Sequence, residues 1–291
     1  MFDAEKVFIR YAAIVEYNGA YFHGWQRQKH HSEPTVQAAL EAALSQVANH
    51  PVDVGCAGRT DTGVHATRQV IHFDSPSVRS DYGWMMGVNT HLPAGVAVQW
   101  VGKVSDDFHA RYKAQARRYR YLIYNQTARP ALMQDQMTWW KYDLNAELMH
   151  EAAQHLIGEH DFTSFRAKDC QAKSPIKEMH RISVTRWGKI IMVDLECSAF
   201  LYHMVRNIVG VLLPIGEGRE PVSWMKDVLD VQNRCKAGVT APGNGLYFVG
   251  VQYPEQFDVP CKAWGPAFIQ PLLDTSRKNH EGPVFVAGRT K

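Results

Sequence analysis

The chain has 291 residues and a mass of 33.0 kDa, and 45% of its residues are hydrophobic against 21% charged. This composition is that of a globular protein and excludes a fibrous or mainly disordered chain. The net charge of +3 does not by itself indicate a nucleic-acid partner. No run approaches the roughly 18 apolar residues of a membrane helix, and the first residues lack the apolar core of a secretory signal. We therefore expect a cytoplasmic protein without membrane contact.

The five cysteines stand far apart, at positions 56, 170, 197, 235 and 261. With no CxxC pair among them, they predict reduced thiols in a cytoplasm. The same scatter argues against a structural zinc site, because such sites usually need closely spaced ligand pairs.

Periodicity and turn residues predict alternating strands and helices in the first hundred residues. A strand and an aromatic loop precede a helix that begins near Pro34 and Thr35. A glycine-rich loop, a strand, a helix and another strand follow. We expect these elements at residues 7–17, 21–26, 35–48, 55–63, 69–73, 80–92 and 96–104.

The remaining chain repeats this order approximately. Residues 117–125 alternate sharply, with odd and even positions on opposite faces of a strand. We expect helices at 145–157 and 200–215, and strands at 180–187, 189–197 and 246–253. The pattern predicts an α+β fold with two similar α/β halves, residues 1–110 and 111–255. Residues 256–291 lose periodicity, and we expect an extension that is poorly ordered or lies along the surface.

The loop at residues 58–65 is the strongest candidate for chemistry. Asp61 stands between glycines and beside Arg59, and a neighbouring arginine favours the charged form that a carboxylate nucleophile needs. A plain polar turn is the alternative. Asp61-Thr62-Gly63 also resembles the aspartic-protease signature, but those enzymes need two copies and this chain has one.

Two further features could contribute to a site. The strand at 117–121 interleaves Arg and Tyr, which suits phosphate contacts and base stacking, although a half-buried strand with a basic edge is an equal alternative. A third basic stretch, residues 166–177, could be only a solvated loop. Arg206 stands in an apolar helix, where it either reaches solvent or pairs with a functional carboxylate.

These motifs together resemble the TruA-type tRNA pseudouridine synthases. The resemblance covers about residues 6–255 and is carried, in the family's order, by YNG at 17–19, FHGWQ at 22–26, GRTDTGVHA at 58–66, ARRYRYLIYN at 116–125, CQAKSPIK at 170–177, AFLYHMVRNIVG at 199–210 and GLYFVGVQYP at 245–254. It implies the pseudouridine synthase fold, a central, mostly antiparallel sheet with the active-site cleft between the two α/β halves.

The resemblance also implies roles for particular residues. Asp61 matches the nucleophile, Tyr119 the tyrosine that packs on the uracil, and Arg206 the arginine that pairs with the aspartate. Arg59 and Arg79 match residues that flip the base or hold the RNA, and Leu246 matches a residue that lines the uracil pocket. Two further stretches match segments that touch the tRNA, namely Phe108, His109, Ala110, Arg111, Tyr112 and Asp169, Cys170, Gln171, Ala172, Lys173.

The implied reaction converts uridine to pseudouridine at tRNA positions 38, 39 and 40, in a homodimer without cofactor or metal. It breaks the N1–C1′ bond, rotates the uracil and joins C5 to C1′, so the absence of a P-loop or dinucleotide motif is consistent. The carboxylate could attack C1′ or C6, and the sequence does not distinguish between these two attacks. An RNA-binding protein without catalysis is the remaining alternative, and the intact loop around Asp61 together with Arg206 disfavours it.

Overall fold

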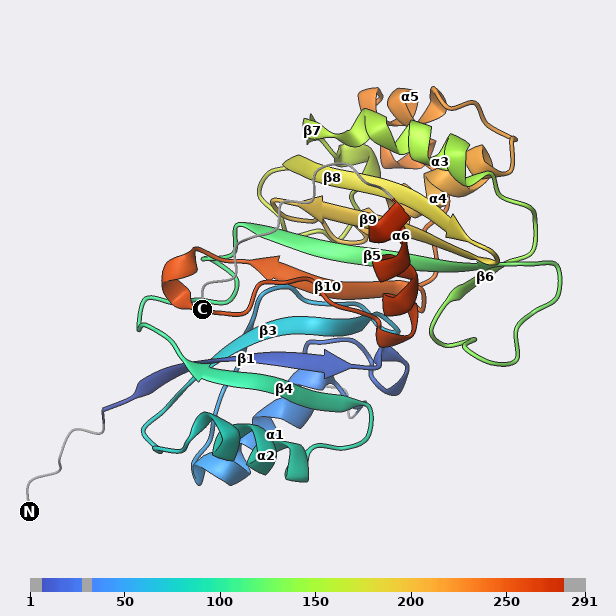
Figure 1. Cartoon of the computed structure of the whole chain (residues 1–291). Helices are drawn as coiled ribbons and strands as arrows, with labels where there is room; N and C mark the ends of the chain where they lie inside the picture. Colours follow the sequence, from blue (N-terminus) through green and yellow to red (C-terminus); the bar gives the residue numbers. More distant parts are fainter. Residues whose placement is uncertain (1–6, 28–32, 280–291) are drawn as a thin grey trace, which may run out of the picture.

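One mixed sheet forms the centre of the computed structural model, which describes residues 7–27 and 33–279 (Figure 1). Within those residues, strands pair in the order β4-β1-β3-β10-β5-β9-β8-β7, with β2 beside β3 and β6 beside β5. The β3–β10 and β5–β6 pairs are parallel and the others antiparallel, which confirms the predicted α+β class. The strands are β1 (Ile9–Tyr17), β2 (Gly55–Cys56), β3 (His65–Ser75), β4 (Val96–Lys103), β5 (Ala116–Asn125), β6 (Thr138–Trp140), β7 (Gly158–Asp161), β8 (Ile176–Trp187), β9 (Ile190–Cys197) and β10 (Leu246–Gln252).

Helices pack on both ends of the sheet and share one large core with it. In Figure 1, α1 and α2 lie beside β1 and β4, whereas α3, α4 and α5 lie beside β8 and β9. The side-chain oxygens of Thr35, Ser80 and Asn145 accept backbone N–H groups and cap the starts of α1, α2 and α3. The helices are α1 (Val36–Ala48), α2 (Asp81–His91), α3 (Ala146–Ala153), α4 (Met204–Gly216), α5 (Trp224–Asp230) and α6 (Gln270–Asn279).

The strand β5 lies in the middle of the sheet, and its alternation agrees with the prediction. Tyr119 and Tyr121 face the large core, whereas Leu122 faces a second apolar cluster on the opposite side. Its neighbour β10 pairs antiparallel with β5 and, at two positions, parallel with β3. Because β10 pairs with both strands, it brings the start of β3 and the middle of β5 close together.

The segment after β10 packs on the sheet more closely than expected. Phe257, Val259 and Ile269 are buried, and Ile269 joins the second apolar cluster together with residues of α6. Arg120 donates a hydrogen bond to the carbonyl of Gly265 at 2.5 Å, and Thr67 donates one to the carbonyl of Trp264. The part of the extension up to residue 274 therefore covers one face of the sheet, and the expectation for residues 280–291 falls outside the described residues.

One predicted helix begins later than its apolar pattern indicates. The pattern predicts a single helix over residues 200–215, but α4 starts at Met204. The preceding residue, His203, has φ 60° and adopts the left-handed region, which an α-helix cannot pass through. His203 therefore lies in a turn before the helix and Arg206 lies inside it.

Candidate active site

A large cleft opens beside the loop that joins β2 to β3, with a volume of about 980 Å³. Its walls come from that loop, from the segments at 109–112 and 169–172, from residues 199–206 and from Leu246 at the start of β10. Five cations line it, namely Arg59, Arg111, Arg117, Lys177 and Arg206, against the two acids Asp61 and Asp169. An excess of positive lining attracts an anionic ligand.

A tight turn presents Asp61 to this cleft. The N–H of Val64 donates to the carbonyl of Asp61 at 3.1 Å, and Gly63 between them has φ +79°. A turn with positive φ at its third residue favours glycine, because a Cβ is strained there. At the far side of the turn, His65 holds the loop: its Nδ1 accepts the Gly19 N–H at 3.0 Å, and its Nε2 lies 3.1 Å from the carbonyl of Asn244.

Two side chains approach the same oxygen of Asp61. Nη1 of Arg206 donates to Oδ2 at 3.2 Å, and Nε2 of His203 lies 3.2 Å from that oxygen. The guanidinium is fixed from behind, since its Nε donates to the carbonyl of Ala241 at 2.7 Å. Among the described residues, no donor reaches Oδ1 of Asp61. That oxygen is therefore the one available to a substrate.

Burial and charge keep His203 neutral near pH 7. Desolvation lowers the pKa of its imidazole, the cations Arg206 and Arg234 lower it further, and Asp61 acts in the opposite direction. The ring contacts that of Tyr202, with centroids 4.0 Å apart and an interplanar angle of 32°. His203 was not predicted as a partner of Asp61, although it stands three residues before Arg206 in the sequence.

Tyr119 forms an aromatic wall of the cleft. It is 8% exposed, and its ring meets Phe200 and Phe248 edge-on at 4.9 Å in both cases. Burial raises the pKa of its phenol, and the nearby charge of Asp61 adds to that rise. The hydroxyl is therefore protonated and can only donate or accept a hydrogen bond.

Arg117 connects the loops that border the cleft. Its guanidinium donates to the carbonyls of Ala57, Arg111, Ala114 and Ser198, at distances between 2.6 and 3.4 Å. These carbonyls belong to the loop that joins β2 to β3, to the 108–115 segment and to the turn before α4. One side chain therefore fixes three segments that are distant in sequence.

Most of the substrate-binding residues named from the sequence line this cleft. Besides Asp61, Tyr119 and Arg206, the cleft contains Arg59, His109, Arg111, Tyr112, Asp169, Cys170, Gln171, Ala172 and Leu246. Phe108 and Ala110 are fully buried beneath it. Lys173 is exposed outside its lining. Arg79 lies before α2, where its guanidinium donates to the carbonyls of Val78 and Val47.

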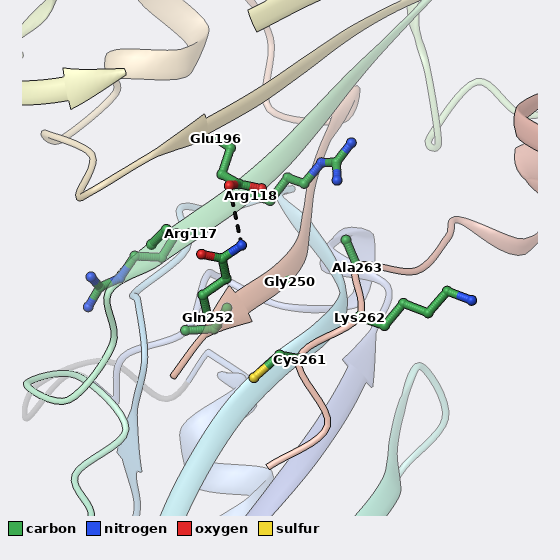
Figure 2. Close-up of a pocket in the computed structure, with 10 residues that line it drawn as sticks. Arg117, Arg118, Glu196, Gly250, Gln252, Cys261, Lys262 and Ala263 are labelled. Atoms are coloured by element: carbon green, nitrogen blue, oxygen red, sulfur yellow. Dashed lines mark hydrogen bonds between the residues drawn. The ribbon is translucent and has the colours of Figure 1, made fainter. Parts of the chain in front are cut away.

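A second, smaller pocket of about 240 Å³ lies between β5, β10 and the segment that follows β10 (Figure 2). Gln252 there points to Glu196 and donates a hydrogen bond at 3.4 Å, while Lys262 points away. None of the site residues named from the sequence lines this pocket. In the described part of the chain, no group of three or more His, Cys, Asp or Glu side chains could hold a metal ion, and no helix there is long and apolar enough to cross a membrane.

Comparison with known proteins places the chain in a family. Residues 13–113 and 152–254 match the model of the tRNA pseudouridine synthases, and the chain belongs to this family of isomerases. The proteins named tRNA pseudouridine synthase A of Shewanella denitrificans and Pseudoalteromonas atlantica are each 53% identical to it over 261 residues. That alignment covers 90% of this chain and 99% and 98% of theirs. The corresponding protein of Colwellia psychrerythraea is 52% identical and fully covered.

Among solved structures, a chain of a Cbf5-Nop10-Gar1 complex aligns at 11% identity. The alignment covers 82% of this chain and 49% of the other chain. The TM-score of 0.34 is too low to carry an argument about this chain.

Proposed function

We propose that this protein isomerises uridine to pseudouridine at positions 38, 39 and 40 of the tRNA anticodon stem-loop, with Asp61 as the nucleophile. The observation that carries the proposal is the Asp61 carboxylate in a positively lined cleft, held at Oδ2 by Arg206 at 3.2 Å. The printed names of the relatives and the matched family model support the tRNA substrate.

The cleft residues suit each step of such a reaction. A stem nucleotide must leave the helix to be modified, and the exposed Arg59 is placed to fill the space that it leaves. Tyr119 and Leu246 provide apolar surface for the flipped uracil. The segments 108–112 and 169–173 are proposed to contact the RNA, with Tyr112 75% exposed beside Arg111. Arg79 is proposed to contact RNA outside the cleft.

The isomerisation balances without an added reagent. The N1–C1′ bond breaks, the uracil rotates, C5 bonds to C1′, the C5 proton leaves and N1 gains a proton. A carboxylate can assist by a transient bond to C1′ or to C6. Either bond consumes the charge of Asp61, and its dissociation restores the carboxylate. Oδ1 is the oxygen free to make that bond.

The division into halves 1–110 and 111–255, the homodimer and the cytoplasmic location are part of the same proposal. The free cysteines among the described residues are compatible with a reducing compartment. Light scattering of the purified protein tests the dimer, and a mass of one chain across micromolar concentrations would contradict it.

Mapping of pseudouridines in unmodified tRNA after incubation with the purified protein tests the reaction directly. We expect modification at positions 38–40 and at least a thousandfold slower tritium release from [5-³H]uridine tRNA with Asp61→Asn, at nearly unchanged tRNA Kd. Asp230→Asn, a surface carboxylate on α5 paired with Lys226, is the matched control and should be unaffected. Normal turnover in Asp61→Asn would refute the proposal.

A further inference from the structure

Three polar side chains are buried directly behind the loop that presents Asp61. Tyr17 ends β1, Gln69 lies in β3 and Thr60 immediately precedes Asp61. Their exposed fractions are 3%, 0% and 7%. All three are buried, and Tyr17 and Gln69 lie outside the lining of the cleft, so their polar groups are placed to hold the surrounding loop.

Hydrogen bonds join these three side chains to one another and to the loop. Nε2 of Gln69 donates to the carbonyl of Gly58 at 2.6 Å and to Oη of Tyr17 at 3.3 Å. A flipped amide would place its oxygen against the Gly58 carbonyl, so the flip is disfavoured. Oη of Tyr17 and Oγ1 of Thr60 lie 2.8 Å apart and share a hydrogen bond in which either hydroxyl can donate. Burial raises the pKa of the Tyr17 phenol, which keeps it protonated.

Contacts on the other side fix the same peptide. The N–H of Trp25 donates to the carbonyl of Thr60 at 2.9 Å. Gly24 has φ +79°, and a Cβ there would stand 2.9 Å from that carbonyl, so only glycine allows the approach. The residue before Asp61 is therefore held by its hydroxyl and by its carbonyl, while Arg206 holds the Asp61 side chain from α4.

The network also has a cost. Oε1 of Gln69 is buried and has no partner among the described residues. A buried acceptor without a donor is unfavourable, and an apolar core at this place would avoid the penalty.

We propose that Tyr17, Thr60 and Gln69 are positioning residues that fix the backbone at Asp61 so that Oδ1 points at the reacting carbon. This inference rests on the proposed role of Asp61 as nucleophile. A displacement of about 1 Å between reacting groups can slow a reaction about a hundredfold. Loss of the Tyr17–Thr60 hydrogen bond should therefore slow chemistry without weakening tRNA binding.

Thr60→Val, Thr60→Ser and Tyr17→Phe test the proposal. The first and third remove one partner's hydroxyl with little change in shape, and the second retains it. We expect Thr60→Val and Tyr17→Phe to lower the single-turnover rate on saturating tRNA about ten- to a hundredfold, with the Kd within about twofold. Thr60→Ser should restore most of the rate. The double variant should be no slower than the slower single variant, because both changes break the same bond.

Ser75→Ala is the control, since it removes a buried hydroxyl at the last residue of β3, where Oγ lies 2.8 Å from Nε2 of His50 and accepts the N–H of Ser77 outside the cleft. Single-turnover rates close to wild type in Thr60→Val and Tyr17→Phe would overturn the inference. Equal slowing by Ser75→Ala at an equal loss of Tm would also overturn it, and so would equal slowing by Thr60→Ser. If Thr60→Val fails to fold, Tyr17→Phe carries the test alone.

Failure of the proposed function would give a different result. The wild type would then yield no pseudouridine, or Asp61→Asn would retain turnover, and the inference would fail together with the proposed function.

Discussion

At the scale of single residues, the sequence indicated which side chains meet but not every partner. The family resemblance implied the Asp61–Arg206 contact, whereas the apolar helix alone left open whether Arg206 reaches solvent or pairs with a carboxylate. His203 was missed, because its apolar surroundings are typical of a helix while its backbone is left-handed. A non-glycine residue in that region is strained, and such strain is typical of functional sites. No propensity scale could show it.

The pKa of His203 predicts a pH effect with a definite sign. Because its folded-state pKa is below 6.5, the imidazole is neutral near pH 7 and gains a proton only as the pH falls into the acid range. The charged groups around it are Asp61, Arg206 and Arg234, and the ring of Tyr202 lies against it. A second cation beside Oδ2 stabilises the carboxylate charge that the attack consumes, so chemistry should slow at acid pH.

His203→Asn isolates this effect, because asparagine tolerates the left-handed region and does not titrate. We expect the ratio of variant to wild-type single-turnover rates to rise about two- to tenfold between pH 7 and pH 5. Acid effects on the tRNA or on other groups cancel in that ratio. A ratio independent of pH would exclude His203 as the titrating group.

At the scale of elements, amphipathic periodicity located α1, α2, β1, β4, β5, β8 and β9 to within a few residues. Short elements such as β2, β6, β7 and α5 were not predicted, since two to seven residues give too little periodicity. Their existence depends on tertiary contacts: β6, for example, forms only by pairing with β5.

The basic stretch at 166–177 separates into structural and exposed cations. Arg166 donates to the carbonyls of Cys170 and Ala172 at 2.7 and 2.8 Å, so it shapes the loop. Lys168 and Lys173 are exposed and lie on the surface of that loop. Lys177, the fourth cation of the stretch, lines the cleft. We propose that the two exposed lysines contact phosphate. The alternative interpretation of the stretch as a merely solvated loop still applies to them.

Salt-dependent binding distinguishes the two interpretations. If a lysine binds a phosphate, its removal should reduce the slope of log Kd against log salt by about 0.7 to 0.9. We expect such a reduction for Lys168→Ala and for Lys173→Ala, measured by titration of labelled tRNA. Lys189→Ala, an exposed lysine of the turn between β8 and β9, is the control and should leave the slope unchanged. Unchanged slopes in all three variants would mean that the loop is only solvated.

At the scale of the whole molecule, the sequence predicted the fold class but not which strands pair across the sheet. The central position of β10 depends on pairing with β3 and β5, which lie more than a hundred residues earlier. Periodicity reports the face of a strand and not its neighbours. Residues 256–291 were expected to be poorly ordered or to lie along the surface, because proline and glycine interrupt their pattern. Within the described part of that extension, Ile269 is fully buried against the second face of the sheet.

That packing predicts a large effect from one small change in the extension. Ile269→Ala removes a fully buried side chain from the cluster that contains Leu122 and Val249. Large-to-small changes in such cores cost about 2–5 kcal/mol, because less apolar surface is buried on folding and a cavity remains. Urea unfolding should show this loss, while Leu132→Ala, at 82% exposure, should change the free energy of unfolding by less than about 0.5 kcal/mol. A loss for Ile269→Ala as small as the control's would mean that the extension does not stabilise the sheet. Because Ile269 belongs to the second apolar cluster and does not line the cleft, the single-turnover rate of the folded variant should stay near wild type.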